Sequence, residues 1–260
     1  MSHRASGKNR SGIFWLALLA WLLAGPAIGG VPETVARLKA SVVGVGTVEK
    51  TRRPPALLLG SGFVVGDGRH VLTNAHVVSK SLNEKGLEYL AVFIGSGSEA
   101  DVRQARVVAR DKEHDLALLE FGGSPQPAAR LGDSDRVREG EEFLFTGFPL
   151  GSALGLYPAT HRAMLAAIVP IALPALASRQ LSPTVIRRLR HPFRIFQLDG
   201  TAYPGNSGSP LYSPDSGEVV GILNMVFVKA SKESALSHPS GIAYAIPIAH
   251  ARRLLESALP

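Results

Sequence analysis

Short apolar runs, separated by glycine, proline and polar turn residues, recur along this sequence from about residue 40 onward. Runs of this length, rich in β-branched and aromatic residues, predict β-strands, and their close spacing is typical of a sandwich or a barrel. A first set of strands is expected at residues 42–48, 57–65, 71–73, 89–94, 102–109, 116–121 and 142–146. A second set is expected at residues 193–198, 210–213, 219–228 and 242–246.

Two segments outside these runs predict helices. Residues 35–40 suit a short helix, and residues 247–259 suit a longer one that begins with Pro247. The apolar residues of the longer segment recur at helical intervals, at Ile248, Leu254, Leu255 and Leu259. We therefore predict an all-β fold of two β-barrels, at about residues 35–145 and 146–246, followed by a C-terminal helix at 247–259.

Residues 151–192 do not fit this alternation and are interpreted as an insertion. Their apolar stretch, 163–177, is interrupted by Pro170 and Pro174, and several arginines follow it. Two prolines disrupt a regular helix, and about 15 residues are short for crossing a bilayer. We expect a surface insertion that packs on the barrel, with its first half able to supply a barrel strand. The alternative is a lid or an element that lies on a membrane surface.

The first 30 residues have the pattern of an export signal. An uncharged apolar run at residues 13–24 follows three basic residues, Arg4, Lys8 and Arg10. Small residues at positions 25 and 27, with Pro26 between them, favour cleavage as a signal peptide. Counted through to Val31, the run is also long enough to act as a signal anchor. We expect an exported protein, periplasmic or otherwise extracytoplasmic, with inner-membrane anchoring through residues 1–30 as the alternative.

Charge and cysteine content exclude several functions for residues 31–260. The whole chain has a net charge of +7, but these residues keep 25 basic against 21 acidic side chains, a net charge of +4. This mild excess gives no reason to expect nucleic acid as a partner. The sequence has no cysteine, so it has neither disulfides nor thiolate chemistry. The eight histidines show no His-Glu-x-x-His spacing, so no metal and no cofactor are expected.

Three segments carry candidate chemistry. Residues 205–210 read Gly-Asn-Ser-Gly-Ser-Pro, a turn that suits an exposed serine nucleophile, Ser207. The backbone of Gly205, Asn206 and Ser207 is expected to form an oxyanion hole, with the Gly205 and Ser207 amides as donors. His76 follows an expected strand and would take the proton of Ser207. Asp115 precedes a different expected strand and would fix the tautomer of His76. An ordinary glycine-serine turn and structural roles for His76 and Asp115 are the alternatives.

The chain order of these residues favours one hydrolase fold, although Asp215 and His238 lie downstream of Ser207, so order alone does not exclude an α/β-hydrolase. His76, Asp115 and Ser207 follow the order of the chymotrypsin-like double barrel. An α/β-hydrolase would place its serine in Gly-x-Ser-x-Gly before a helix, whereas here Ser209 and Pro210 follow. His114 is a poor candidate for the base, since it adjoins the carboxylate that would orient a histidine from elsewhere.

Several further motifs join these segments: Gly-Ser-Gly-Phe-Val-Val at 60–65, Leu-Gly-Asp-Ser-Asp at 131–135 and Gly-Phe-Pro-Leu-Gly at 147–151. With them, residues 35–250 resemble the trypsin-like serine proteases of the HtrA/Deg group. The resemblance implies a chymotrypsin-like double six-stranded β-barrel, a catalytic triad of His76, Asp115 and Ser207, and no cofactor. It also implies hydrolysis of protein or peptide substrates through an acyl-enzyme, in quality control or regulated proteolysis.

The sequence departs from that group in three places. HtrA-type proteases usually carry PDZ domains after the protease domain, whereas this sequence ends after the expected helix, so we expect a protease domain without one. Ser209 stands where the group usually has a second glycine, and the 151–192 region is longer than usual. The aromatic residues associated with trimers have no clear counterpart, so the sequence indicates no oligomeric state.

The same resemblance places the substrate pocket. Thr201 matches its base, and Asn224, Met225 and Val226 match the edge that pairs with substrate. No acidic residue lies at that base, and bulky Val226 stands at a wall where a glycine would open the pocket. Small or medium aliphatic residues are therefore expected before the cleaved bond, rather than basic ones. Two other functions stay open: a non-catalytic binding or chaperone module on a protease scaffold, and an esterase.

Overall fold

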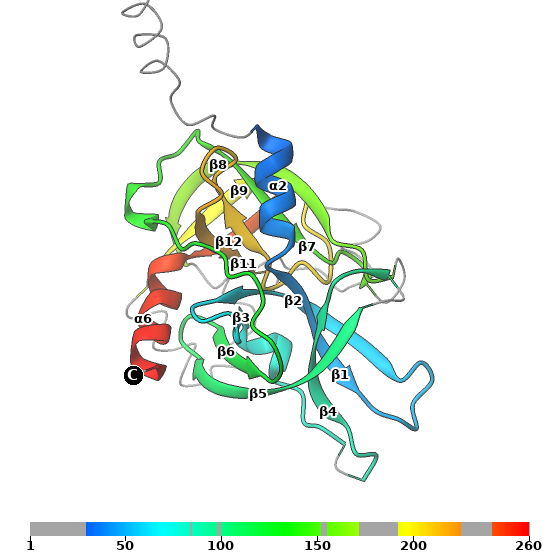
Figure 1. Ribbon diagram of the computed structural model, residues 1–260. Coiled ribbons are helices and arrows are strands. Elements are labelled where there is room, and N and C mark those ends of the chain that lie inside the picture. The colour runs from blue at the N-terminus through cyan, green and yellow to red at the C-terminus, as the bar shows by residue number, and fades with distance from the viewer. Residues whose placement is uncertain are drawn as a thin grey trace, which may run out of the picture.

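The computed structural model describes residues 30–83, 85–97, 100–151, 155–171, 192–224 and 241–259. These residues form two closed antiparallel β-barrels, which lie one above the other in Figure 1. Each barrel has six strands, and a helix ends the described chain. The all-β double six-stranded barrel with a C-terminal helix, expected from the sequence, is therefore confirmed.

The first barrel is the lower one in Figure 1. Its strands are β1 (Val42–Val48), β2 (Ala56–Val65), β3 (His70–Asn74), β4 (Tyr89–Ile94), β5 (Asp101–Asp111) and β6 (Leu116–Phe121). The spatial order is β1-β2-β3-β6-β5-β4, and pairing of β4 with β1 closes the sheet. Closure leaves no sheet edge free for pairing with another chain.

The second barrel repeats this order. Its strands are β7 (Glu142–Gly147), β8 (Ala159–Pro170), β9 (Arg194–Asp199), β10 (Pro210–Tyr212), β11 (Val219–Leu223) and β12 (Ile242–Pro247). Neighbours in space run β10-β11-β12-β9-β8-β7, and β7 closes the barrel on β10.

One boundary differs from the expected organisation, and one expected segment is defined more closely. Residues 142–147 form β7, which pairs with β8 and β10, so the boundary between barrels lies before residue 142 rather than at 145. The hydrophobic pattern defines a strand but not its partners, which explains this error. The first half of the expected insertion at 151–192 supplies a barrel strand, as the sequence allowed: residues 159–170 form β8, which ends at Pro170. Residues 152–154 and 172–191 of that insertion lie outside the described residues.

Helices cover the barrels at two places. Helix α2 (Val31–Lys39) precedes β1, and α6 (Ile248–Ala258) follows β12 directly, with Pro247 at its N-cap. The buried face of α6, which includes Ala251 and Leu254, packs against residues of both barrels. Figure 1 shows α6 alongside the junction between them. The helix therefore helps to fix one barrel against the other.

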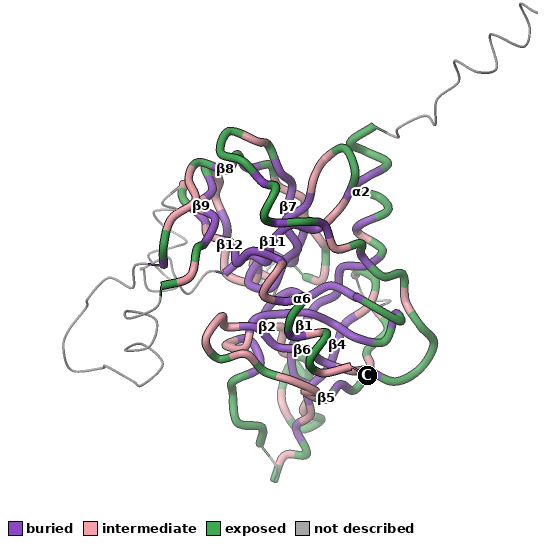
Figure 2. The backbone as a smooth tube through the Cα atoms, turned by 90° about the vertical axis from the view of Figure 1, so that its left-hand side faces the viewer, coloured by how far each residue is buried: buried purple, intermediate pink, exposed green. Residues whose placement is uncertain are grey.

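The buried residues form three hydrophobic cores, which appear purple in Figure 2. One fills the first barrel, around Val92 and Leu119, and one fills the second, around Phe145 and Leu198. The third lies between the barrels and includes fully buried Tyr212. Truncating a large side chain in such a core typically costs about 2–5 kcal/mol. The junction between the barrels is therefore a packed interior, and this packing fixes the position of one barrel against the other.

Candidate active site

Strand pairing brings His76 and Asp115 together. β3 and β6 run antiparallel, and Asn74 at the end of β3 pairs with Leu116 at the start of β6. His76 lies just after β3, in the short 3₁₀ helix η1 (Ala75–Val78), and Asp115 lies just before β6. Asp115 has a positive φ of 56°, a conformation that is costly for a non-glycine residue and is typical of functional sites.

The carboxylate of Asp115 accepts hydrogen bonds on both oxygens. The His76 backbone N–H donates to Oδ1 at 2.9 Å, and the His76 ring Nδ1 lies 2.6 Å from Oδ2. The Asn224 side chain donates from Nδ2 to the same Oδ2 at 2.7 Å. A carboxylate can only accept, so Nδ1 of His76 carries a proton, and a neutral ring then keeps its Nε2 lone pair for use as a base.

Ser207 lies in the loop between β9 and β10, and both barrels hold this loop. Its carbonyl oxygen accepts a hydrogen bond of 2.8 Å from Ser61 N of β2. On the other side, Gly208 N donates to Leu223 O of β11 at 3.0 Å. Asn224, the next residue, contacts Asp115. The fold therefore brings the loop of Ser207 and the pair formed by His76 and Asp115 to one place between the barrels.

The turn before Ser207 has its carbonyl groups fixed. Pro204 O accepts from Leu150 N at 2.7 Å, and Gly205 O accepts from the Ser61 hydroxyl at 2.7 Å. A trans peptide directs its N–H opposite to its C=O, so the Gly205 N–H points away from Leu150. Among the described residues, this N–H donates no hydrogen bond. Gly205 has φ of 101°, and a Cβ there would clash with the Phe148 carbonyl oxygen, so the turn requires glycine.

The side chain of Asn206 faces inward, next to the same turn. It is fully buried, and neither of its polar atoms has a hydrogen-bond partner within the described part of the chain. Its backbone N–H donates to Tyr203 O at 2.9 Å. Of the three residues expected at an oxyanion hole, Asn206 thus has its amide engaged, whereas the Gly205 amide is available.

The residues expected at the substrate pocket are only partly described. Thr201 follows β9 and is half-buried, and Asn224 follows β11 with its backbone N–H bonded to Tyr244 O at 2.9 Å. Met225 and Val226 lie outside the described residues. The contact of the Asn224 side chain with Asp115 was not expected from the sequence, which suggested only backbone pairing with substrate.

Two further residues were missed or set aside by sequence reasoning. Ser61 was noted only as part of a motif, yet its hydroxyl also accepts from Phe148 N at 2.9 Å. A polar residue inside an otherwise apolar expected strand is the sequence signal that could have identified it. His114, which the sequence makes a poor candidate for the base, contacts other groups: Nδ1 lies 2.5 Å from Asp111 Oδ2, and the ring stacks on His250.

The residues that the structure describes also bear on metal binding and on crossing a membrane. They contain no cluster of three or more histidine and carboxylate side chains arranged to hold a metal ion. None of their helices has the length and apolar character to cross a bilayer.

Comparisons with known proteins agree with this fold. Residues 60–222 match the family of the trypsin-like peptidase domain. A probable periplasmic serine endoprotease, DegP-like, of Pseudomonas putida is 32% identical over 197 residues, which cover 76% of this chain and 34% of that protein. A protein of the same description from Halomonas elongata is 31% identical over 190 residues, covering 73% of this chain and 33% of that protein. The chain thus spans about a third of the length of these relatives.

Comparison with solved structures gives a consistent result. The HtrA-type protease AlgW with a tripeptide superposes with a TM-score of 0.64 at 25% identity, covering 88% of this chain and 63% of that one. The same protease with a decapeptide has a TM-score of 0.64 at 23% identity and supports the fold. This chain therefore belongs to the family of trypsin-like peptidases, with relatives of the DegP and HtrA type.

Proposed function

We propose that this chain is an exported serine endopeptidase that hydrolyses protein or peptide substrates through an acyl-enzyme. Ser207 is the nucleophile, His76 the general base and then acid, and Asp115 the group that orients His76. The 2.6 Å contact between His76 Nδ1 and Asp115 Oδ2 carries this proposal, because it fixes the tautomer that an active base needs.

The proposed reaction uses each of these groups in turn. His76 Nε2 takes the Ser207 proton as the hydroxyl oxygen attacks the substrate carbonyl, and it later gives that proton to the leaving amine. The Gly205 and Ser207 amides stabilise the negative charge on the carbonyl oxygen, a contribution of about 3–4 kcal/mol for one such donor. The orientation of the Gly205 N–H away from Leu150, and its lack of another described partner, support this role. Water then hydrolyses the ester formed on Ser207.

Substrate and location are proposed from the sequence and from the relatives. The relatives are named periplasmic serine endoproteases, and residues 1–30 carry an export signal, so we place the protein outside the cytoplasm. Quality control or regulated proteolysis is the expected biological task. Thr201 and the 224–226 edge would bind the residue before the cleaved bond, with a preference for small or medium aliphatic side chains. Cleavage of a peptide library would contradict that preference if basic residues dominated.

Labelling with a fluorophosphonate probe tests the nucleophile. We expect the wild-type protein to be labelled and Ser207→Ala to lose labelling completely. Ser209→Ala is the matched control, since it removes a neighbouring buried hydroxyl from the same loop and should leave labelling intact. Equal labelling of wild type and Ser207→Ala would refute the assignment.

Measurements of substrate turnover distinguish an endopeptidase from an esterase and from a binding module. A labelled protein that cleaves an unfolded protein substrate is an endopeptidase, whereas one that hydrolyses only activated esters is an esterase. A protein that binds unfolded chains without Ser207-dependent labelling or cleavage would be a binding module. The proposal requires cleavage of the protein substrate by wild type and its loss in both Ser207→Ala and His76→Ala.

A further inference from the structure

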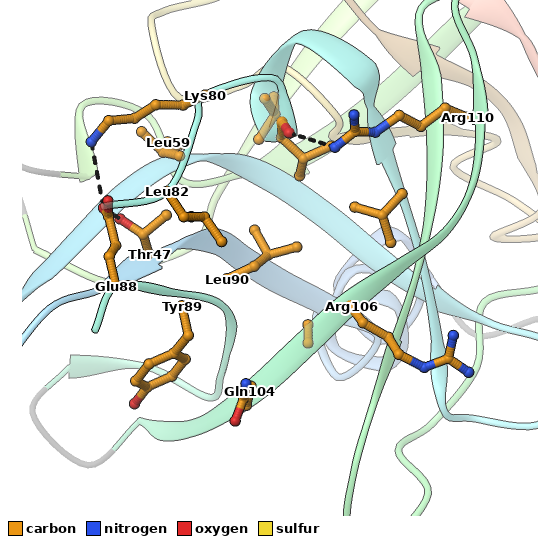
Figure 3. Close-up of a pocket in the computed structure, with 14 residues that line it drawn as sticks. Thr47, Leu59, Lys80, Leu82, Glu88, Tyr89, Leu90, Gln104, Arg106 and Arg110 are labelled. Carbon is orange, nitrogen blue, oxygen red and sulfur yellow. Dashed lines mark hydrogen bonds and ion pairs between the residues drawn. The ribbon is translucent and has the colours of Figure 1, made fainter. Parts of the chain in front are cut away.

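A cavity of about 350 Å³ opens on the first barrel, beside η1 (Figure 3). Its inner wall is apolar and includes Leu59, Val77 and Leu90, the last of which is 8% exposed. Leu82, which is 40% exposed, lies at the cavity as well. A volume near 300 Å³ is the lower end for small-ligand sites, so this cavity suits one or two amino-acid side chains.

The cavity lies next to the candidate active site. Val77, in its wall, directly follows His76. Gly60 separates this wall from the nucleophile loop: a Cβ on Gly60 would lie 2.8 Å from Val77 Cγ2 and 2.9 Å from Ser207 O. The preceding residue, Leu59, also lines the cavity. A chain bound across His76 and Ser207 on the first-barrel side would therefore pass next to this wall.

Some of the charged side chains around the cavity are paired with opposite charges, and others are not. Glu88, the one carboxylate among the described residues that line it, accepts hydrogen bonds from Thr47 at 2.5 Å and Arg52 at 2.7 Å, and Lys80 lies 3.4 Å from it. The negative charge of Glu88 is thus neutralised by cations that are already in place.

Arg110 lies across the cavity from Glu88 (Figure 3) and is solvent-exposed. It donates to Val78 O at 2.9 Å, and among the described residues no carboxylate pairs with it. Arg106, also at the cavity, pairs with Glu120. The cavity therefore combines an apolar wall with an uncompensated positive charge on its Arg110 side.

We propose that this cavity binds the part of a peptide substrate that leaves on acylation, taking an apolar side chain close after the cleaved bond and an acidic side chain near Arg110. The inference rests on the proposed endopeptidase function. His76 must give its proton to the leaving amine, so that part of the substrate lies on the His76 side of Ser207, which is the first-barrel side. Complementary charge then favours a carboxylate beside Arg110.

Internally quenched peptides test this inference. The sequence before the cleaved bond is the same in all peptides. After the cleaved bond, the first two positions are either Leu or Ala, and the next two positions are Asp, Asn or Lys. We expect leucine to raise kcat/KM about tenfold over alanine, the usual effect of filling an apolar pocket. Aspartate should exceed the isosteric asparagine by about threefold at low salt, and the difference should shrink as ionic strength screens an exposed charge.

Substitutions of residues that line the cavity provide a second test of the inference. Arg110→Glu should reverse the order of the Asp and Lys peptides, and Leu82→Ala should reduce the ratio between Leu and Ala peptides. Arg69→Glu is the matched control, because Arg69 is an exposed arginine of the same barrel that does not line the cavity. It should leave both preferences unchanged.

The fluorophosphonate probe separates failure of this inference from failure of the proposed function, since the probe has no peptide leaving group. Wild-type protein that is labelled at Ser207 but cleaves the Leu and Ala peptides equally would overturn the inference alone. Absence of both labelling and cleavage would overturn the proposed function and this inference with it.

Discussion

Asn224 of the second barrel and His76 of the first barrel hydrogen-bond to the same oxygen, Oδ2 of Asp115, at 2.7 and 2.6 Å. Asn224 is fully buried and follows β11, the strand that also holds the Ser207 loop. The position of the Asp115 carboxylate therefore depends on how the barrels dock, and the docking couples the proposed base to the proposed nucleophile.

Asn224→Ala should lower kcat by roughly 10- to 100-fold while leaving the fold intact. A hydrogen bond to a charged group is worth about 1.5–3 kcal/mol, and without this one the carboxylate can turn away from His76. Asn224→Asp, nearly identical in shape, should be more damaging, because it places a second carboxylate against Asp115. Single-turnover acylation rates measure both effects, and an unchanged rate in Asn224→Ala would exclude the positioning role.

Gly205→Ala should reduce the rate of fluorophosphonate labelling by about 100-fold or more. The added Cβ would clash with the Phe148 carbonyl oxygen, so the turn must move and the Gly205 amide is lost as an oxyanion donor. Gly66→Ala is the matched control: Gly66 also has a positive φ, of 63°, but open space surrounds its Cβ position. We expect that variant to lose only about 1–2 kcal/mol of stability and to label normally. Similar labelling of the two variants would contradict the proposed oxyanion turn.

The elements predicted from the sequence were those with strong local signals. Alternating apolar runs between turn residues defined most strands, and Pro247 followed by spaced apolar residues defined α6. β8 was less clear, because its sequence continues into a longer apolar, proline-containing stretch, and only pairing with β7 and β9 defines it as a strand. Strand pairing across long sequence separations also decided that residues 142–147 belong to the second barrel.

In the candidate site, too, some features could be predicted from local sequence and others depend on contacts between distant segments. Chain order and residue type were enough to propose His76, Asp115 and Ser207. The contacts of Asn224 and Ser61 were not predictable, because each joins atoms of different barrels and depends on side-chain direction at the junction. Local sequence carries no information on such directions.

Ser209→Ala should raise the free energy of unfolding by about 1 kcal/mol. Ser209 is fully buried, and its hydroxyl has no hydrogen-bond partner in the described residues. Removing an unpaired buried hydroxyl relieves a desolvation cost of about 1–3 kcal/mol, partly offset by the lost packing of the oxygen. Denaturant unfolding of both proteins measures the difference. A clear loss of stability would show that the hydroxyl is satisfied in solution.

A cluster on α6 should make stability depend on acidic pH. The His250 ring stacks on His114 at 3.9 Å between ring centroids, and Phe193 contacts both rings edge-on. Burial, followed by the nearby charges of His114 and Arg253, lowers the pKa of His250 to about 4, while Asp111 acts in the opposite direction. The folded state therefore holds His250 neutral under conditions in which the unfolded chain would protonate it.

The sign of the effect follows from proton binding. An unfolded histidine has a pKa near 6.5, so between pH 6.5 and 4 the unfolded state binds more protons at this position, and the free energy of unfolding falls as the pH falls. His250→Phe keeps an aromatic ring for stacking but cannot titrate. Other groups, including His161, whose pKa is also lowered by burial, titrate in both proteins. Denaturant unfolding at a series of pH values should therefore show a steeper loss for wild type than for His250→Phe between pH 6.5 and 4, and a constant difference above pH 7. Parallel curves across the whole range would exclude His250 as a source of acid sensitivity.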